Sequence, residues 1–185
     1  AILLDTLKFK KSKILENIIV INVDNPREFY GYMCSKFYKL DFDNLVAVTG
    51  TNGKTSVAWI VQNLWNKIGI KSASIGTLGI YDGDNFYKTG LTTPNIDEIY
   101  KKLSELNKRG FKNIIIEASS HGIDQNRIGG LEICIAAITS LSRDHLDYHG
   151  SYKNYKNTKL KLFKNIPKKG VAIINDSIKE IDEFI

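Results

Sequence analysis

Cysteine, proline and arginine are scarce in this 185-residue sequence, and long apolar runs are absent. The two cysteines, Cys34 and Cys134, lie one hundred residues apart in apolar surroundings, so we expect reduced thiols and not a disulfide framework. No apolar run approaches the ~18 residues that a membrane-spanning helix needs. The start has neither the basic segment nor the cleavage site of an export signal. We therefore expect a cytoplasmic, globular protein without a membrane partner.

An initiator methionine is also missing, because the chain begins Ala-Ile-Leu-Leu-Asp. At the other end, residues 178–185 stop inside a helix-like pattern. Both ends predict that the sequence is a fragment of a longer protein. A hydrophobic content of 43% and a charged content of 25% indicate one α/β domain with a sizeable core, and the length leaves room for part of another.

The net charge of +6 comes largely from residues 151–169, which hold seven lysines and no acidic residue. Such a run is compatible with a nucleic-acid partner, with a polyanionic small substrate, or with the solvated face of a helix. Only four arginines occur in the whole sequence, and no aromatic ladder accompanies the lysines. We therefore expect no nucleic-acid partner.

Strand-like and helix-like segments alternate along the chain, which predicts an α/β fold with a mostly parallel sheet covered on both faces. A polar break at residues 41–44 is the candidate domain boundary. In the helix expected over 57–68, apolar residues at 57, 60, 61, 64 and 68 predict one buried stripe. The other expected helices are 26–38, one that follows Pro94 and is closed by Gly110, and 151–164. The expected strands are 2–4, 18–21, 45–48, 113–117, 133–138 and 171–174, with a hairpin formed by 72–81 and 86–88.

Residues 48–55 read Val-Thr-Gly-Thr-Asn-Gly-Lys-Thr between an expected strand and an expected helix, as a phosphate-binding loop does. Glycines allow the backbone N–H groups to converge on phosphate oxygens at the start of the helix. Lys54 can then reach the β- and γ-phosphates, and the Thr55 hydroxyl can bind Mg²⁺. The predicted nucleotide site comprises Gly50, Thr51, Asn52, Gly53, Lys54, Thr55 and Ser56.

Polar residues also follow the other expected strands, and in open α/β sheets ligands gather at these strand ends. Glu117 ends one strand, and Arg143-Asp144-His145 follows another. A carboxylate and a histidine near the phosphate loop suit a second divalent cation, although Glu117 alone is equally compatible with capping the next segment. His149 lies four residues after His145, a spacing that a zinc pair on a helix uses, but Asp147 and Gly150 argue against a helix there.

Two further polar groups have an equally open interpretation. Thr92-Thr93-Pro94 precedes a helix, where a threonine is either the N-cap or a contact to an anionic ligand. Arg127, close to Gln125, suits a phosphate or carboxylate fork but also a surface salt bridge.

Taken together, these motifs resemble the Mur ligase family of bacterial cell-wall synthesis, and most of all its tripeptide synthetases. The resemblance rests on Thr-Gly-Thr-Asn-Gly-Lys-Thr at 49–55, Thr-Thr-Pro at 92–94, Glu-Ala-Ser-Ser-His-Gly at 117–122 and Leu-Ser-Arg-Asp-His-Leu-Asp-Tyr-His-Gly at 141–150. It implies that residues 1–40 end an N-terminal uridine-binding domain and that 41–185 are part of the central ATP-binding domain. The C-terminal amino-acid-binding domain would be absent, which predicts that the fragment alone is inactive.

The resemblance also implies an activity, namely ATP-dependent addition of the third amino acid to UDP-MurNAc-dipeptide through an acyl phosphate, by a monomer. Whether that amino acid is diaminopimelate or lysine is left open. ATP and Mg²⁺ would be the cofactors, with Glu117 and His145 holding a second Mg²⁺. The implied UDP-MurNAc-dipeptide contacts are Thr92, Thr93, Ser119, Gln125 and Arg127.

Lys159 occupies the position of a lysine that is carbamylated in the family. The sequence departs from the family here, because Lys156 and Asn157-Thr158 replace a more usual Glu and two Ala. A solvated lysine is therefore the alternative. For the whole chain, the alternatives are a related ligase such as folylpolyglutamate synthetase, a module that only binds nucleotide, and a nucleic-acid-binding module with a phosphate loop.

Overall fold

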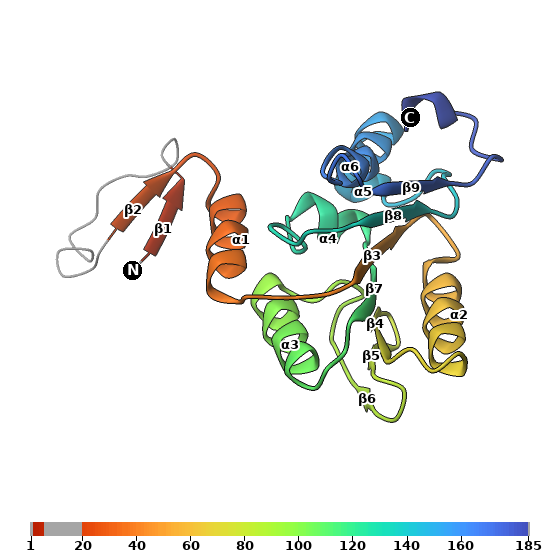
Figure 1. Cartoon of the computed structure of the whole chain (residues 1–185). Helices are drawn as coiled ribbons and strands as arrows, with labels where there is room; N and C mark the ends of the chain where they lie inside the picture. The colour runs from red at the N-terminus through yellow and green to blue at the C-terminus, as the bar shows by residue number, and fades with distance from the viewer. Residues whose placement is uncertain (1, 6–19, 185) are drawn as a thin grey trace.

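The computed structural model describes residues 2–5 and 20–184 and has a seven-stranded main sheet (Figure 1). The strand order is β6-β5-β4-β7-β3-β8-β9. Five strands pair in parallel, namely β4 (Ser72–Gly76), β7 (Asn113–Glu117), β3 (Asn44–Thr49), β8 (Ile135–Ile138) and β9 (Val171–Ile174). The remaining two, β5 (Gly79–Tyr81) and β6 (Phe86–Tyr87), continue one edge in antiparallel pairing. The predicted α/β class with a mostly parallel sheet is confirmed.

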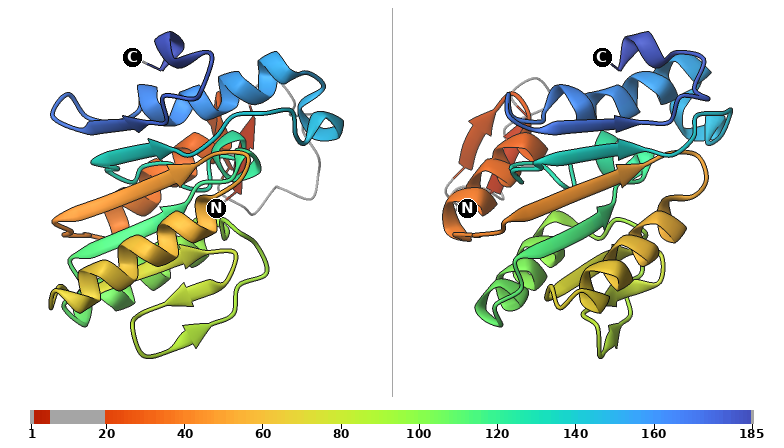
Figure 2. Two further views of the ribbon diagram at one scale, coloured as in Figure 1. Left: turned by 90° about the vertical axis from the view of Figure 1, so that its right-hand side faces the viewer. Right: turned by 45° about the vertical axis from the view of Figure 1, so that its right-hand side comes forward.

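Helices cover both faces of this sheet, with α2 (Lys54–Lys67) on one side and α3 (Ile96–Lys108) on the other (Figures 1 and 2). The side of α3 also holds α4 (Ser120–Asp124) and α6 (Tyr152–Lys164), and the single-turn α5 (Leu146–His149) precedes α6. Successive side chains of a strand point to opposite faces. Leu45 and Ala47 therefore join the core on the α3 side, while Val46 and Val48 pack toward α2.

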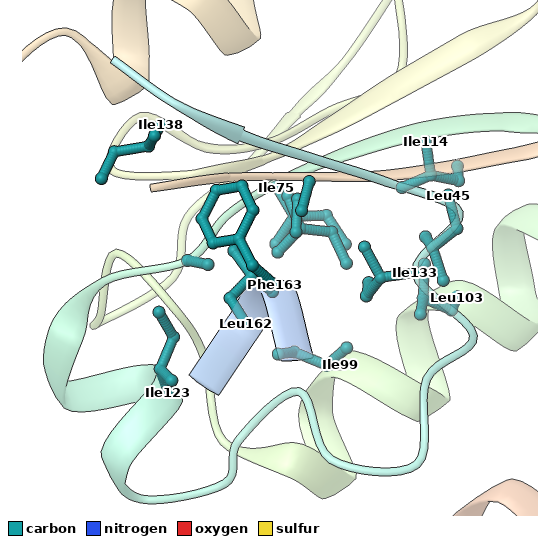
Figure 3. Packing of buried hydrophobic residues seen from close by; sticks show 14 of the residues in the cluster. Leu45, Ile75, Ile99, Leu103, Ile114, Ile123, Ile133, Ile138, Leu162 and Phe163 are labelled. Carbon is teal, nitrogen blue, oxygen red and sulfur yellow. The ribbon is translucent and has the colours of Figure 1, made fainter. Parts of the chain in front are cut away.

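The larger core lies between the sheet and the helices α3, α4 and α6 (Figure 3). The predicted inward face of α3 is confirmed, since five of its residues are buried: Ile96, Ile99, Tyr100, Leu103 and Leu106. Leu162 and Phe163 of α6 reach the same cluster. This packing fixes the ends of the parallel strands at one edge of the sheet.

The N-terminal segment forms a separate two-stranded parallel sheet from β1 (Ile2–Asp5) and β2 (Val20–Val23), followed by α1 (Pro26–Phe37) (Figure 1). Pro26 opens α1 as predicted, and the Asn25 side chain caps it by accepting a hydrogen bond from the Glu28 N–H at 3.2 Å. Ile18 and Ile19, in the strand expected over 18–21, lie outside the described residues. The division of the chain at residue 40 remains a prediction.

Two expectations about the first half of the main sheet are wrong. The predicted stripe of α2 is only partly buried: Val57 and Val61 pack against the sheet. By contrast, Ile60, Leu64 and, just after the helix, Ile68 are 54%, 54% and 70% exposed. The segment 72–81 is not one strand, since the chain reverses at Thr77-Leu78 between β4 and β5. The hairpin across residues 82–85 does form, between β5 and β6.

Smaller differences occur elsewhere. The strand expected over 133–138 begins at Ile135, and a one-turn helix forms at residues 146–149 despite Asp147 and Gly150. Residues 178–184 contain one 3₁₀ turn (Ile181–Glu183) in place of a longer helix, although Phe184 is buried. Within the described ranges, no helix has the length and apolar character to cross a membrane.

Candidate active site at the phosphate loop

The loop between β3 and α2 has the conformation that a phosphate-binding loop needs. Gly50 and Gly53 adopt φ angles of +145° and +86°, which L-residues with a side chain rarely adopt. A Cβ on Gly50 would lie 2.0 Å from Thr139 Oγ1, so this position also requires glycine for space. Residues after β8 hold the loop from the side, since Thr139 Oγ1 donates to the carbonyls of Thr49 (3.1 Å) and Asn52 (2.5 Å).

The start of α2 is open to an anion. No side chain caps this fourteen-residue helix, and its first turn contains no acidic residue. The backbone N–H groups of a helix start and the helix dipole both favour negative charge there. Lys54 adds a cation whose Nζ donates to the carbonyls of Gly50 (2.9 Å) and Thr51 (3.1 Å). Burial lowers the pKa of Lys54, although Glu117 and Asp144 nearby oppose that shift.

Glu117, at the end of β7, is only 2% exposed and is bound by two threonines. It accepts hydrogen bonds from Thr55 Oγ1 (2.8 Å), from the Thr77 N–H (2.9 Å) and from Thr77 Oγ1 (3.2 Å). A Cβ on Gly76 would lie 1.9 Å from Glu117 Oε1, so the backbone of β4 leaves room for this carboxylate. The following helix α4 is capped by Ser119 and not by Glu117, so the capping alternative is wrong.

Lys159 on α6 lies beneath the same loop and is 1% exposed. Its Nζ donates to the Gly50 carbonyl (3.1 Å) and to Thr49 Oγ1 (3.3 Å), and lies 4.6 Å from the centre of the Tyr155 ring. Burial, and then the neighbouring Lys54, lower the pKa of Lys159 from 10.5 to about 7, against the opposing effect of Asp144. The alternative of a solvated lysine is therefore wrong.

His145 is not joined to Glu117 by any hydrogen bond among the described residues. Its ring lies 4.8 Å from that of His121, and its Nε2 lies 3.5 Å from the Asp144 carboxylate. His149 is buried, and its Nε2 has no hydrogen-bond partner in the part of the chain that the structure describes. Within residues 2–5 and 20–184 no group of three or more His, Cys, Asp or Glu side chains is arranged to hold a metal, so the zinc pair gains no support.

The five predicted substrate residues form one connected network next to the phosphate loop. Thr93 Oγ1 donates to the Glu117 carbonyl (2.7 Å), lies 3.0 Å from Ser119 Oγ and accepts from the Ser119 N–H (2.9 Å). Thr92 Oγ1 lies 3.1 Å from Thr77 Oγ1, which ties the network to the Glu117 carboxylate.

Arg127 extends the network on the other side. Its guanidinium donates to the Thr93 carbonyl (2.8 Å) and, from Nη2 (2.6 Å) and Nε (3.1 Å), to Gln125 Oε1. These acceptors are a carbonyl and an amide, and no salt bridge of Arg127 occurs within the described ranges. The N-cap of α3 is Asn95, so neither Thr92 nor Thr93 caps that helix.

Sequence reasoning missed Thr77 and Tyr155. Tyr155 is buried, packs on Lys159, and its hydroxyl lies 2.9 Å from Thr51 Oγ1. Its position four residues before Lys159 on one helix was a usable signal, because such residues share a face. Thr77 had a weaker signal, the glycines at 76 and 79 that flank its turn.

Comparison with known proteins gives a consistent result. The Mur ligase middle domain matches residues 48–185. A UDP-N-acetylmuramoyl-L-alanyl-D-glutamate–2,6-diaminopimelate ligase from Zymomonas mobilis subsp. mobilis is 44% identical over 161 residues, which are 86% of this chain and 33% of that protein. A solved structure of an enzyme of the same name superimposes with a TM-score of 0.81 at 30% identity, covering 92% of this chain and 35% of that one. The chain thus spans about a third of the length of the relatives it matches.

A ligand-free bifunctional folylpolyglutamate synthase/dihydrofolate synthase from Yersinia pestis is more distant. It superimposes with a TM-score of 0.57 at 15% identity, over 85% of this chain and 45% of that one. At that identity, the likeness shows the fold alone.

Proposed function

The chain belongs to the Mur ligase family, and we propose that it is the ATP-binding part of a ligase that adds 2,6-diaminopimelate to UDP-MurNAc-L-Ala-D-Glu. The observation that supports this most is the convergence of Lys54, Glu117 and Lys159 on one phosphate loop, beside the network around Thr93. The choice of diaminopimelate rests on the name of the relative from Zymomonas mobilis. We further assign residues 1–40 to the end of an N-terminal uridine-binding domain and 41–185 to the central domain.

ATP would bind with its β- and γ-phosphates at the start of α2, where Lys54 supplies the side-chain cation. The residues present fit Mg²⁺, because the Thr55 hydroxyl and the Glu117 carboxylate are oxygen ligands and touch at 2.8 Å. Bound Mg²⁺ supplies neutralisation of the phosphate charge. His145 would be a ligand of a second Mg²⁺ through a ring nitrogen.

Thr92, Thr93, Ser119, Gln125 and Arg127 would orient the UDP-MurNAc-dipeptide so that its terminal carboxylate faces the γ-phosphate. A carboxylate oxygen then attacks the γ-phosphorus, the bond to ADP breaks, and an acyl phosphate forms. The amine of diaminopimelate attacks the acyl carbon, and inorganic phosphate leaves as the amide forms. Lys54 is placed to oppose the repulsion between the two anions in the first step.

Lys159 has the properties that carbamylation needs. Only a neutral amine reacts with CO₂, and a lysine with a pKa of about 7 is largely neutral slightly above neutral pH. The neutral amine nitrogen forms a bond to the carbon of CO₂ and releases one proton, which leaves a carbamate anion beside the loop. We propose that this carbamate helps to position the metal next to Glu117.

The nucleic-acid alternative loses its main support. Lys159 is buried, while Lys156 pairs with Glu183 at 2.5 Å and Lys161 with Asp124 at 3.4 Å. The lysines of α6 thus do not present one continuous, unpaired face.

Calorimetry of ATP·Mg²⁺ binding to the 185-residue chain tests the nucleotide site. Replacing Lys54 by Ala removes a charge-assisted contact to phosphate, so affinity should fall by at least about tenfold. Lys67→Ala, at the far end of the same helix, is the matched control and should bind like the unaltered chain. Equal affinity in all three proteins refutes the assignment of Lys54.

The ligase activity is tested in the full-length protein that contains this chain, with ATP, Mg²⁺, UDP-MurNAc-L-Ala-D-Glu and diaminopimelate. Lys159→Ala should lose most phosphate release and regain part of it with added short carboxylates, which can replace a carbamate. Nucleotide binding without any substrate-dependent phosphate release would identify a module that only binds nucleotide.

A further inference from the structure

A pocket of about 250 Å³ opens beside Arg127. Three elements line it: α1 of the N-terminal segment, the start of α3, and the loop after α4. The lining residues are Arg27, Tyr30, Asn95, Ile96, Asp97, Gln125, Asn126 and Arg127. The pocket therefore continues the predicted substrate network from Gln125 and Arg127 onto a helix that sequence analysis did not connect with it.

Two arginines line this pocket, Arg27 on α1 and Arg127 on the loop after α4. Burial lowers the pKa of Arg127, and the nearby Arg27 lowers it further, against the opposing effect of Tyr148. Three of the five N–H groups of Arg127 bind Thr93 and Gln125, which leaves two for a ligand. An anion between the two arginines would relieve their repulsion and accept hydrogen bonds from both.

The backbone that carries Arg27 is fixed against the loop after α4. The Arg27 carbonyl accepts a hydrogen bond from Asn126 Nδ2 at 3.3 Å. One turn further along α1, a Cβ on Gly31 would lie 2.9 Å from the carbonyl carbon and oxygen of Gly129, so the two backbones meet directly. The position of Arg27 relative to Arg127 therefore follows from tight packing and not only from a flexible side chain.

The start of α3 brings both donors and acceptors to this region. Its N-cap, Asn95, makes no side-chain capping bond, while its first turn carries Asp97 and Glu98. Asp97 lies in the same lining and is an acceptor. A ligand that combines an anionic group with a hydrogen-bond donor fits both features better than a simple inorganic anion.

We propose that Arg27 is a substrate-binding residue that grips, together with Arg127, an anionic group of the UDP-MurNAc-dipeptide. This inference rests on the proposed function and extends it, because it makes α1 a part of the substrate site. The anionic group is either the diphosphate or a carboxylate of the peptide. An amide N–H of the peptide would supply the donor for Asp97.

The test measures binding of UDP-MurNAc-L-Ala-D-Glu by calorimetry to the full-length protein that contains this chain. Arg27→Ala should weaken binding by about tenfold to a hundredfold, the usual effect of losing a hydrogen-bonded charge. Arg27→Lys keeps the charge but not the planar fork, so its loss should be smaller but measurable. Lys36→Ala, at the other end of α1, removes the same charge and should change binding less than about twofold.

ATP·Mg²⁺ affinity and the thermal unfolding midpoint, measured on the same variants, should match the unaltered chain and show that the fold is intact. UDP-MurNAc without the dipeptide distinguishes the two anionic groups: a loss in Arg27→Ala for both ligands identifies the diphosphate, and a loss for the dipeptide ligand alone identifies the peptide. Equal affinity of Arg27→Ala and the unaltered chain overturns the role of Arg27 and leaves the proposed function standing. Absence of binding by the unaltered full-length protein overturns both.

Discussion

Replacing Lys159 by Met should stabilise the fold near neutral pH, because the native state buries a cationic amine. The folded pKa of Lys159 is about 7, whereas a lysine in an unfolded chain titrates near 10.5. Between these two values the unfolded chain binds one proton more than the folded chain. Stability therefore rises with pH through this window, and the cost of burying the charge is largest below about pH 7.

The size of the effect follows from the same window. Each pH unit changes the free energy of unfolding by about 1.4 kcal/mol, so the unaltered chain should gain about 2–3 kcal/mol relative to Lys159→Met between about pH 7 and pH 9. Lost hydrogen bonds to Thr49 and Gly50 change the absolute difference between the two proteins. These lost hydrogen bonds do not change the pKa of the lysine in the unfolded chain. The slope of the unfolding free energy against pH therefore reports only the burial of the amine.

Urea unfolding, followed by circular dichroism in buffers freed of CO₂, measures this slope. Removing CO₂ matters because carbamylation would replace the titrating amine. Lys153→Met is the matched control, since Lys153 lies exposed on the same helix and its removal should leave the pH dependence unchanged. A stability difference between Lys159→Met and the unaltered chain that is independent of pH would refute the depressed pKa, and with it the reasoning that links Lys159 to CO₂.

Two further predictions concern the polar groups around Glu117. Thr93→Val should destabilise the chain by about 2–3 kcal/mol in urea unfolding, because its buried hydroxyl is hydrogen-bonded to both the Glu117 carbonyl and Ser119. Thr92→Val, which loses one exposed contact, should cost less than about 1 kcal/mol. Gly76→Ala places a methyl group against Glu117 Oε1 and should weaken Mg²⁺-dependent ATP binding by at least about tenfold in calorimetry. Gly90→Ala, where a Cβ meets nothing within 4 Å, is its control, and equal binding by both variants would contradict the predicted metal role of Glu117.

Local sequence patterns predicted the fold well where one pattern determines one element. The strand 113–117 has the predicted bounds, because a glycine turn precedes its short apolar run and a carboxylate ends it. The helix α2 shows the limit. Gln62 is fully buried, with Nε2 3.4 Å from the Ser72 carbonyl, so a polar residue occupies the sheet-facing side while Ile60 and Leu64 lie outside. Apolar periodicity cannot detect a buried amide whose partner comes from another strand.

The sequence predicted which strand ends carry the candidate site residues, but not which of these residues contact one another. Glu117 follows β7, yet the N–H that binds it belongs to Thr77, forty residues earlier, in a turn that was predicted as strand. Lys159 gave no local sign of burial, since six other lysines surround it within residues 151–169. Its environment comes from Thr49 and Gly50, more than one hundred residues away. Only the packing of α6 beneath the phosphate loop distinguishes it from its neighbours.

The buried Lys159 and the uncapped start of α2 meet at the same loop, so the charge at one affects the other. Parallel pairing brings the ends of β3, β7 and β8 to the same edge, where the loop carbonyl of Gly50 accepts hydrogen bonds from both Lys54 and Lys159. Two cations on one carbonyl repel each other, so the charge on one of them is favourable only when an anion shares the space. A phosphate group at the start of α2 would supply that anion from one side, and a carbamate on Lys159 would remove the repulsion from the other. A carbamate beside Glu117 would help to hold Mg²⁺, and Mg²⁺ neutralises the phosphate charge, so binding of ATP·Mg²⁺ and carbamylation should reinforce each other. The CO₂ dependence of ATP·Mg²⁺ affinity measures that coupling: Lys159→Met should abolish it, whereas Lys153→Met should not.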